Sequence, residues 1–296
     1  MTDDASFSIS IDQQLARCTR QSDFIHGVTS PGVYLSDSQL VHSTATDRPI
    51  FGVTCLSDEV FVVLDGKPEV DVCDVNSLTK QRRLTVTGLS NSWDMTSYAQ
   101  NKCLFIINYD GERVYRVELN ECVTSWTVNG SGSGLSMTAK CNVLVTLYSP
   151  SKLKEFTQNG QLIREIILQQ DVAYPHHAVQ FASGQFVGSH VNGDQHRVCL
   201  VGDDERVIQF YEGKKRSAAG QMNVPYHLAV DKQGFILTAD HYNNRVLLLS
   251  PSLTCVKELI TKDRELHEPF RLCLDEKRRY LYVGEWSGSQ VSAFKF

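Results

Sequence analysis

Eight polar side chains occupy two corresponding positions of a pattern that repeats along this chain. Asp94, His177, His227 and Arg271 hold the first position, and Asn108, His190, Asp240 and Glu285 hold the second. His176, His241 and Trp286 stand next to members of this set. Imidazole groups together with carboxylates bind Zn²⁺, whereas a set dominated by oxygen ligands suits Ca²⁺. We therefore treat all eleven residues as candidates for binding a ligand.

The same residues support two hypotheses. In the first, His177, His190, His227, Asp240 and Glu285 hold a zinc or calcium ion. Such an ion would polarise a carbonyl group or activate water, which predicts a metal-dependent hydrolase or lyase. In the second, the polar groups are structural. Asp240 and Asn243 would then bind backbone N–H groups of their turn, and Arg245 and Arg113 would brace turns through carboxylates.

The stretch 225–249 shows which elements position these residues. Its sequence PYHLAVDKQGFILTADHYNNRVLLL contains three apolar runs, at 227–230, 235–239 and 245–249. Two polar segments rich in Asp, Asn and Gly separate the runs, and such segments favour turns. Three short β runs joined by two short turns predict an antiparallel meander.

This meander recurs along the chain. Similar units start at Pro49, Ser92, Gly134, Pro175, Pro225 and Pro269, with spacings of 43, 42, 41, 50 and 44 residues. A repeat of this length with four short strands predicts a propeller blade, so the expected fold is all-β, a six-bladed propeller with a central channel. The candidate residues would line that channel. The segment GSGSG (130–134) is expected to be a flexible loop between blades.

The last unit reaches Phe296 after only three strands. We therefore expect an N-terminal strand at 38–42 to pair with 290–296, which would remove two exposed strand edges. FSISI (7–11) is a second candidate for this role. The expected domain organisation is a propeller over 38–296, preceded by an extension over 1–37 of unknown role.

Residues 225–249 resemble the consensus of the NHL-repeat propellers, and 269–294, 92–117 and 175–200 resemble it more loosely. The chain is similar to the propeller domains of tripartite-motif (TRIM) proteins over about 250 of its 296 residues. It has no zinc-ligand spacing for a RING or B-box, and residues 1–48 are too few for a coiled coil. A fold hosts many functions, and our first hypothesis is a recognition scaffold that binds a protein, peptide or other ligand, such as a small molecule, at the funnel or rim. Some propellers of this family bind single-stranded RNA on a basic face.

Composition limits the remaining classes. The formal net charge of −5 argues against a surface that grips nucleic acid throughout. The basic groups at Lys80 to Arg83, Lys214 to Arg216 and Lys277 to Arg279 are expected on separate surfaces, which makes RNA binding possible but not favoured. Nine cysteines without a CxxC pair predict reduced core thiols and a cytoplasmic location. No secretory signal is expected, and no apolar run is long enough for a membrane span.

Overall fold

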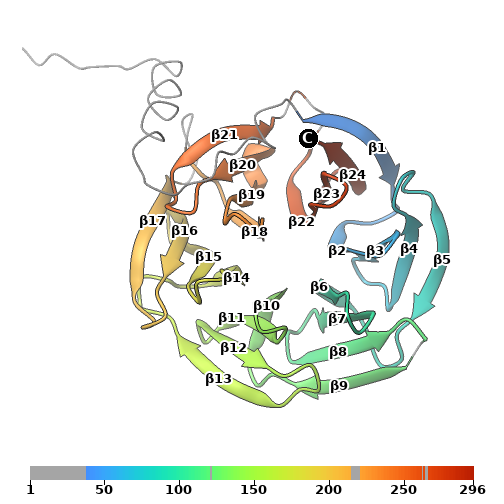
Figure 1. Cartoon of the computed structure of the whole chain (residues 1–296), viewed down its shortest axis with the longest axis horizontal. Helices are drawn as coiled ribbons and strands as arrows, with labels where there is room; N and C mark the ends of the chain where they lie inside the picture. Colours follow the sequence, from blue (N-terminus) through green and yellow to red (C-terminus); the bar gives the residue numbers. More distant parts are fainter. Residues whose placement is uncertain (1–37, 121, 215–220, 262, 264–265) are drawn as a thin grey trace, which may run out of the picture.

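The computed structural model describes residues 38–120, 122–214, 221–261, 263 and 266–296. It contains six four-stranded antiparallel sheets arranged as a ring around a central axis (Figure 1). The strands β2, β6, β10, β14, β18 and β22 lie nearest the axis, and β5, β9, β13, β17, β21 and β1 form the perimeter (Figure 1). The predicted all-β six-bladed propeller is therefore confirmed.

The first three blades follow the chain from the innermost strand outward. Blade one contains β2 (Ile50–Leu56), β3 (Glu59–Leu64), β4 (Glu69–Asp74) and β5 (Lys80–Thr85). Blade two contains β6 (Ser92–Tyr98), β7 (Cys103–Asn108), β8 (Arg113–Glu118) and β9 (Val123–Thr127). Blade three contains β10 (Ser131–Met137), β11 (Val143–Ser149), β12 (Lys152–Phe156) and β13 (Leu162–Ile167).

The next two blades repeat this order. Blade four contains β14 (Pro175–Gln180), β15 (Phe186–Asn192), β16 (Gln195–Val201) and β17 (Val207–Lys214). Blade five contains β18 (Pro225–Val230), β19 (Ile236–Asp240), β20 (Arg245–Leu249) and β21 (Cys255–Ile260), with a short 3₁₀ turn η2 (His241–Asn243) between β19 and β20.

Blade six joins the two ends of the described chain. It contains β22 (Pro269–Asp275), β23 (Tyr280–Glu285), β24 (Gln290–Lys295) and, as its outer strand, β1 (Gln39–Ala45). The β1–β24 pairing runs antiparallel from Gln39 opposite Lys295 to Ala45 opposite Gln290. The predicted closure by an N-terminal strand is confirmed. The expected extension 1–37 and its FSISI segment lie outside the described residues.

Apolar side chains fill the space between neighbouring blades. Phe61 and Val63 of blade one, for example, belong to one buried cluster with Met95 and Leu104 of blade two. Full burial of each such side chain contributes roughly 1.5–3 kcal/mol of hydrophobic stabilisation. These inter-blade layers hold the six sheets in fixed positions, and so they fix the loops at the ends of the strands.

Each innermost strand has an irregular start. The pairing with the second strand shifts register between Ser92 and Asp94, between Pro175 and His177, and between Pro269 and Arg271. Similar shifts occur at the starts of β2, β10 and β18. A bulge places two residues opposite one and changes the direction of the side chains beside it. Consecutive residues at the start of each inner strand can therefore face different surroundings.

The segment GSGSG is not an inter-blade loop, because β10 begins at Ser131. Its glycines allow close packing between blades. A Cβ atom on Gly132 would lie 2.1 Å from Cδ1 of Ile107, and one on Gly134 would lie 2.8 Å from Cδ2 of His177. The prediction was wrong because a glycine-rich sequence is also what close backbone approach in a strand requires.

Candidate functional site

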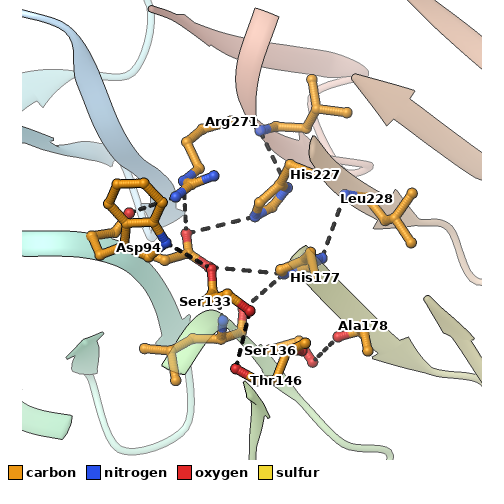
Figure 2. A network of polar contacts seen from close by, with 12 residues as sticks. Asp94, Ser133, Ser136, Thr146, His177, Ala178, His227, Leu228 and Arg271 are labelled. Atoms are coloured by element: carbon orange, nitrogen blue, oxygen red, sulfur yellow. Dashed lines mark hydrogen bonds and ion pairs between the residues drawn. The ribbon is translucent and has the colours of Figure 1, made fainter. Parts of the chain in front are cut away.

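The structure brings together the four polar residues at the third position of the repeats (Figure 2). Nε of Arg271 lies 3.2 Å from Oδ1 of Asp94, and Nε2 of His227 lies 3.6 Å from the same oxygen. Nε2 of His177 lies 4.0 Å from Oδ2 of Asp94. The two imidazole rings stack with their centroids 3.7 Å apart. We call Asp94, His177, His227 and Arg271 the axial network, and all four are buried.

The axial network joins neighbouring blades through backbone groups. Oδ2 of Asp94 accepts a hydrogen bond of 2.8 Å from the Leu135 N–H of blade three. Arg271 of blade six donates to the carbonyl groups of Phe51 in blade one and Trp93 in blade two, at 2.9 and 2.6 Å. Because each side chain reaches a strand of another blade, the network stabilises the ring at its centre.

Hydrogen bonds define which ring nitrogen of each histidine carries the proton. The Leu228 N–H donates to Nδ1 of His177 at 3.4 Å, so the proton lies on Nε2, which donates to the Leu135 carbonyl at 3.0 Å. In the same way, the Leu272 N–H donates to Nδ1 of His227 at 3.4 Å. The Nε2–H of His227 therefore points to Asp94, 3.6 Å away.

Burial determines the protonation states in this network. It lowers the pKa of His177 to about 3, with help from neighbouring His227, and it also lowers the pKa of His227. Burial alone would raise the pKa of Asp94, but the positive charge of Arg271 and contacts with both histidines hold it at about 2. At neutral pH the network therefore contains one carboxylate, one guanidinium and two neutral imidazoles.

Asp94, His177 and His227 are the group of described residues whose ligand atoms lie close enough to share a metal ion, within 4.8 Å of one another. Their hydrogen bonds do not fit that use. Metal binding needs a lone pair on Nε2, but both Nε2 atoms carry protons while both Nδ1 atoms accept backbone N–H groups. Arg271 already supplies the positive charge beside Asp94. The arrangement suits a structural ion pair better than a bound cation.

The five residues of the expected metal set are not gathered at one place. His177 and His227 lie in the axial network, whereas His190, Asp240 and Glu285 belong to no group that could share an ion within the described residues. The second-position residues lie at or near the ends of the second strands, where the side chains have different neighbours in each blade. Matching positions in the repeat placed them at one end of the ring but did not place their side chains against one another.

Asp240 holds a turn together. Its carboxylate accepts hydrogen bonds from the Asn223 N–H at 2.6 Å, the Asn243 side chain at 2.8 Å and Nε of Arg245 at 2.7 Å. Burial raises its pKa, and these partners oppose the rise. This is the pattern that the structural hypothesis predicts for Asp240, Asn243 and Arg245. At the corresponding site of blade two, Oδ1 of Asn108 accepts the Arg113 N–H at 2.9 Å, and Nη1 of Arg113 donates to a serine hydroxyl rather than to a carboxylate.

Glu285 and His190 are buried candidates with unusual surroundings. Burial raises the pKa of Glu285 to about 7, although the His267 N–H and the Ser292 hydroxyl donate to its carboxylate. Burial lowers the pKa of His190 to about 4, with a smaller contribution from nearby Arg197. Neither ring nitrogen of His190 has a hydrogen-bond partner among the described residues. Both residues are fully enclosed, so neither presents its polar group to a ligand.

A second layer of side chains lies immediately beside the axial network. It consists of aromatic rings and histidines in mutual contact, which we call the aromatic mouth: Phe51, Trp93, Tyr109, Tyr148, Tyr174, His176, Tyr226, His241, Tyr242, Phe270 and Trp286. Trp286 stacks on Phe51 with centroids 4.9 Å apart, and Phe270 contacts Trp286 at 4.8 Å. Cζ of Arg271 lies 4.0 Å from the centroid of the Phe270 ring, which connects the two layers.

The rim of the aromatic mouth is open to solvent. Tyr109, Tyr148, Tyr174 and Tyr242 are 58%, 41%, 47% and 56% exposed, whereas Phe51 and Phe270 at the centre are buried. A positive φ of 49° at Tyr174, directly before Pro175, orients the chain as it enters β14. Exposed aromatic rings that adjoin a buried aromatic floor are typical of interaction surfaces.

Three members of the mouth, His176, His241 and Trp286, were among the candidates that the sequence identified. The three exposed tyrosines of blades two to four, Tyr109, Tyr148 and Tyr174, were not among them. A signal was present. The residue that follows the second position of the repeat is aromatic or histidine in four of the six units: Tyr109, Tyr148, His241 and Trp286.

A cavity lies at the opposite end of the inner strands. It has a volume of about 710 Å³ and is lined by the ends of β10, β14, β18 and β22 and by turns that follow them, including Gln180, Asp231 and Asp275. None of the eleven candidate residues lines it. We place the candidate site at the aromatic mouth, because the cavity lining combines ordinary turn residues without a convergent set of aromatic or buried polar groups.

Four of the basic residues considered for RNA binding pair with carboxylates. Lys80 and Arg83 both pair with Asp71 at 2.8 Å, and Arg82 pairs with Glu59 at 3.0 Å. Arg278 pairs with Asp275 at 2.8 Å. These contacts leave little positive charge free for a phosphate backbone. The eight cysteines within the described residues are free thiols. No helix among the described residues is long and apolar enough to cross a membrane.

No protein-family model matches the sequence, and no curated protein is significantly similar to it. Solved structures do share its fold. Hydrazine synthase of Kuenenia stuttgartiensis matches with a TM-score of 0.62 and 12% identity, over 86% of this chain and 97% of that one. A catalytically inactive variant of virginiamycin B lyase from Staphylococcus aureus, with quinupristin, matches with a TM-score of 0.64 and 10% identity, over 88% of this chain and 100% of that one. A Bacteroides thetaiotaomicron protein of unknown function matches with a TM-score of 0.66 and 12% identity, over 88% of this chain and 75% of that one. At these identities the likeness shows the propeller fold alone.

Proposed function

We propose that this protein is a recognition scaffold that binds a protein or peptide segment at the aromatic mouth. One observation carries the proposal. Four exposed tyrosines surround a buried aromatic floor at the end of a rigid ring. Tyrosine offers a large contact area, loses little conformational entropy on binding and is enriched among the residues that dominate binding energy.

The resemblance to NHL and TRIM propellers supports the same proposal, since it implies recognition by the loops of a propeller. The ligand class stays a proposal, and a small molecule remains an alternative occupant of the mouth. The cytoplasmic location also stays a prediction, supported by the free thiols.

A metal-dependent hydrolase or lyase receives less support. His177 and His227 hold protons on the nitrogens that would bind zinc or calcium, and Arg271 stands beside the carboxylate. The structural neighbours include a lyase and a synthase, but their identity of about a tenth carries no residue roles to this chain. Binding of single-stranded RNA receives less support as well, because Arg82, Arg83 and Arg278 are engaged with carboxylates.

Selection from a library of short random peptides displayed on phage tests the proposal. We expect selected peptides to bind the full chain and to lose at least tenfold in affinity on the Tyr109→Ala, Tyr148→Ala double variant. Ile208→Ala is the matched control, because Ile208 is 54% exposed on the perimeter strand β17. Peptides that bind the tyrosine variant as tightly as the original protein would contradict the proposed site.

A further inference from the structure

Charge is distributed unevenly around the aromatic mouth. Because adjacent strands run in opposite directions, the loop that enters each inner strand lies at the same end as the loop between the second and third strands. In blades two to four these loops comprise residues 86–91, 109–112, 128–130, 150–151, 168–174 and 193–194. They contain four acidic residues, Asp110, Glu112, Asp171 and Asp194, and no Lys or Arg.

The four acidic side chains are exposed, and none has an ion pair with another described residue. The nearest basic residues along the chain start the third strands and are directed to the outer strands. Nη1 of Arg113 donates to the Ser125 hydroxyl at 3.1 Å, and Nζ of Lys152 donates to Glu165 at 2.9 Å. This sector of the mouth therefore has four carboxylates that form no ion pair with a basic side chain of the described residues.

The same sector contains three of the four exposed tyrosines of the mouth. Tyr109 directly precedes Asp110, and Tyr174 lies in the loop that contains Asp171. The rings of Tyr148 and Tyr174 contact each other with centroids 4.9 Å apart, and His176 extends this group toward the centre. We call Tyr109, Tyr148 and Tyr174 with Asp110, Glu112 and Asp171 the acidic sector. The corresponding loops of blade one differ, since Arg48 and Lys67 accompany Asp47 and Asp65 there, and Nζ of Lys67 lies 4.0 Å from Asp47.

We propose that the acidic sector binds a peptide segment through a lysine or arginine side chain that lies against its tyrosine rings. This inference rests on the proposed function and specifies the chemistry of the partner. A cation gains from the negative faces of tyrosine rings, and nearby carboxylates add attraction and accept hydrogen bonds from ammonium or guanidinium groups. An acidic peptide or a nucleic acid would meet like charge in this sector, so these partners are disfavoured.

Tyr242 provides an internal comparison. It is 56% exposed on η2 of blade five, but its loop, residues 241–244, has no acidic residue. If exposed aromatic area alone attracted the partner, Tyr242 would contribute as much as Tyr174. If a basic side chain directs binding, the partner depends on the acidic sector and depends little on Tyr242.

The first experiment uses the peptides recovered from the random display library. We expect lysine and arginine to be enriched over the unselected library. Replacing arginine by citrulline, which keeps the shape and removes the charge, should weaken binding at least tenfold. Raising the salt concentration should weaken the arginine peptide more than the citrulline peptide, because salt screens exposed charges.

The second experiment neutralises the acidic sector with the triple variant Asp110→Asn, Glu112→Gln, Asp171→Asn. We expect at least fivefold weaker binding of the arginine peptide and less than twofold change for the citrulline peptide. Asp203→Asn is the control, because Asp203 is an exposed acidic residue in the turn between β16 and β17 at the opposite end. It should change neither affinity.

The two proposals fail in different ways. If selected peptides depend on Tyr109 and Tyr148 but show no basic enrichment and ignore the triple variant, the mouth is the binding site and the basic partner is wrong. If selected peptides bind the tyrosine variants unchanged, or if no peptide is recovered, both the proposed function and this inference are contradicted.

Discussion

Two layers at the start of the same inner strands have opposite properties. In blades two, four, five and six, consecutive residues form the pairs Trp93 and Asp94, His176 and His177, Tyr226 and His227, and Phe270 and Arg271. The second member of each pair belongs to the buried axial network, and the first belongs to the aromatic mouth. A shift of one residue along the chain therefore separates the polar network that holds the ring together from the aromatic layer that lies beside it.

Titratable residues at a propeller axis are therefore not by themselves a binding or catalytic site. Asp94 pairs with Arg271 and accepts a backbone hydrogen bond, Arg271 donates to backbone carbonyl groups, and the bulge at the start of each strand directs these side chains inward. The aromatic residues have no comparable internal use for their exposed faces. Measurements of unfolding free energy and of peptide affinity can therefore test the roles of the two layers separately.

The largest effect is expected from Asp94→Asn. The substitution preserves size but leaves the buried Arg271 guanidinium without its negative partner, which should cost about 3–5 kcal/mol of unfolding free energy. Urea denaturation measures this cost. Adding Arg271→Met should recover part of it, because the uncompensated charge is then removed. A loss below about 1 kcal/mol for Asp94→Asn would mean that the axial network does not stabilise the ring.

The fold was largely predictable from the sequence, because each blade repeats its own turn and strand signals. The period gave six sheets, and the missing strand of the last unit gave the pairing of β1 with β24. The interior of the ring was less predictable. The alignment of the repeats placed Asp94, His177, His227 and Arg271 at the same height along the ring axis, and in the structure these side chains do meet. Nothing in the sequence indicated that backbone groups of other blades would form hydrogen bonds with them.

The second-largest effect is expected in the pH dependence of the protein's stability, and it arises from Glu285. Burial raises its pKa from 4.5 to about 7, so between these values the folded protein retains a proton that the unfolded chain has lost. Stability should therefore fall as pH rises through this window, by up to about 3 kcal/mol. Glu285→Gln cannot ionise, and it should gain stability relative to the original protein at about pH 8 but not at pH 4.5.

Thermal unfolding of both proteins across this pH range measures the difference. Glu112→Gln is a suitable control, because Glu112 is an exposed glutamate whose replacement should leave the pH profile unchanged. An equal difference between Glu285→Gln and the original protein at both pH values would exclude Glu285 as the source of the pH dependence.

A smaller effect is expected from single tyrosine substitutions. Tyr174→Ala should weaken a selected arginine peptide about tenfold, or about 1.4 kcal/mol, while changing the unfolding free energy by less than about 1 kcal/mol. Tyr242→Ala should change affinity less than about twofold. Titration calorimetry and urea denaturation give the two quantities. A large loss of unfolding free energy in Tyr174→Ala would contradict the separation of the two layers. A larger loss of peptide affinity in Tyr242→Ala than in Tyr174→Ala would contradict the choice of the acidic sector.

The smallest effect is expected from metal ions. Because the Nε2 atoms of His177 and His227 carry protons, zinc or calcium should not raise the melting temperature, and a chelator should not lower it. Elemental analysis of protein purified without chelator provides a second measurement. One zinc or calcium ion per chain, lost together with stability in His177→Gln, would revive the metal-dependent hydrolase or lyase.

The mouth was harder to predict than the network for a physical reason. The sequence shows which positions are aromatic, but exposure decides their use. Phe51 is buried at the centre, whereas Tyr148 and Tyr174 form an open edge, and this difference depends on how the blades pack around them. Tyr109 follows β7 and Tyr148 lies near the end of β11, and both strands have the sequences of ordinary core strands, so the position of the two tyrosines on one surface emerges only when the ring closes.

One measurement tests the separation of the two layers most directly. An NMR titration of the full chain with a selected arginine peptide can follow backbone amide, tyrosine ring and histidine imidazole resonances together. We expect the rings of Tyr109, Tyr148 and Tyr174 to shift, while His177 and His227 keep their neutral Nε2–H form. Shifts confined to the two histidines, or to Gln180 and Asp231 beside the cavity at the opposite end, would contradict the assignment of binding to the aromatic mouth.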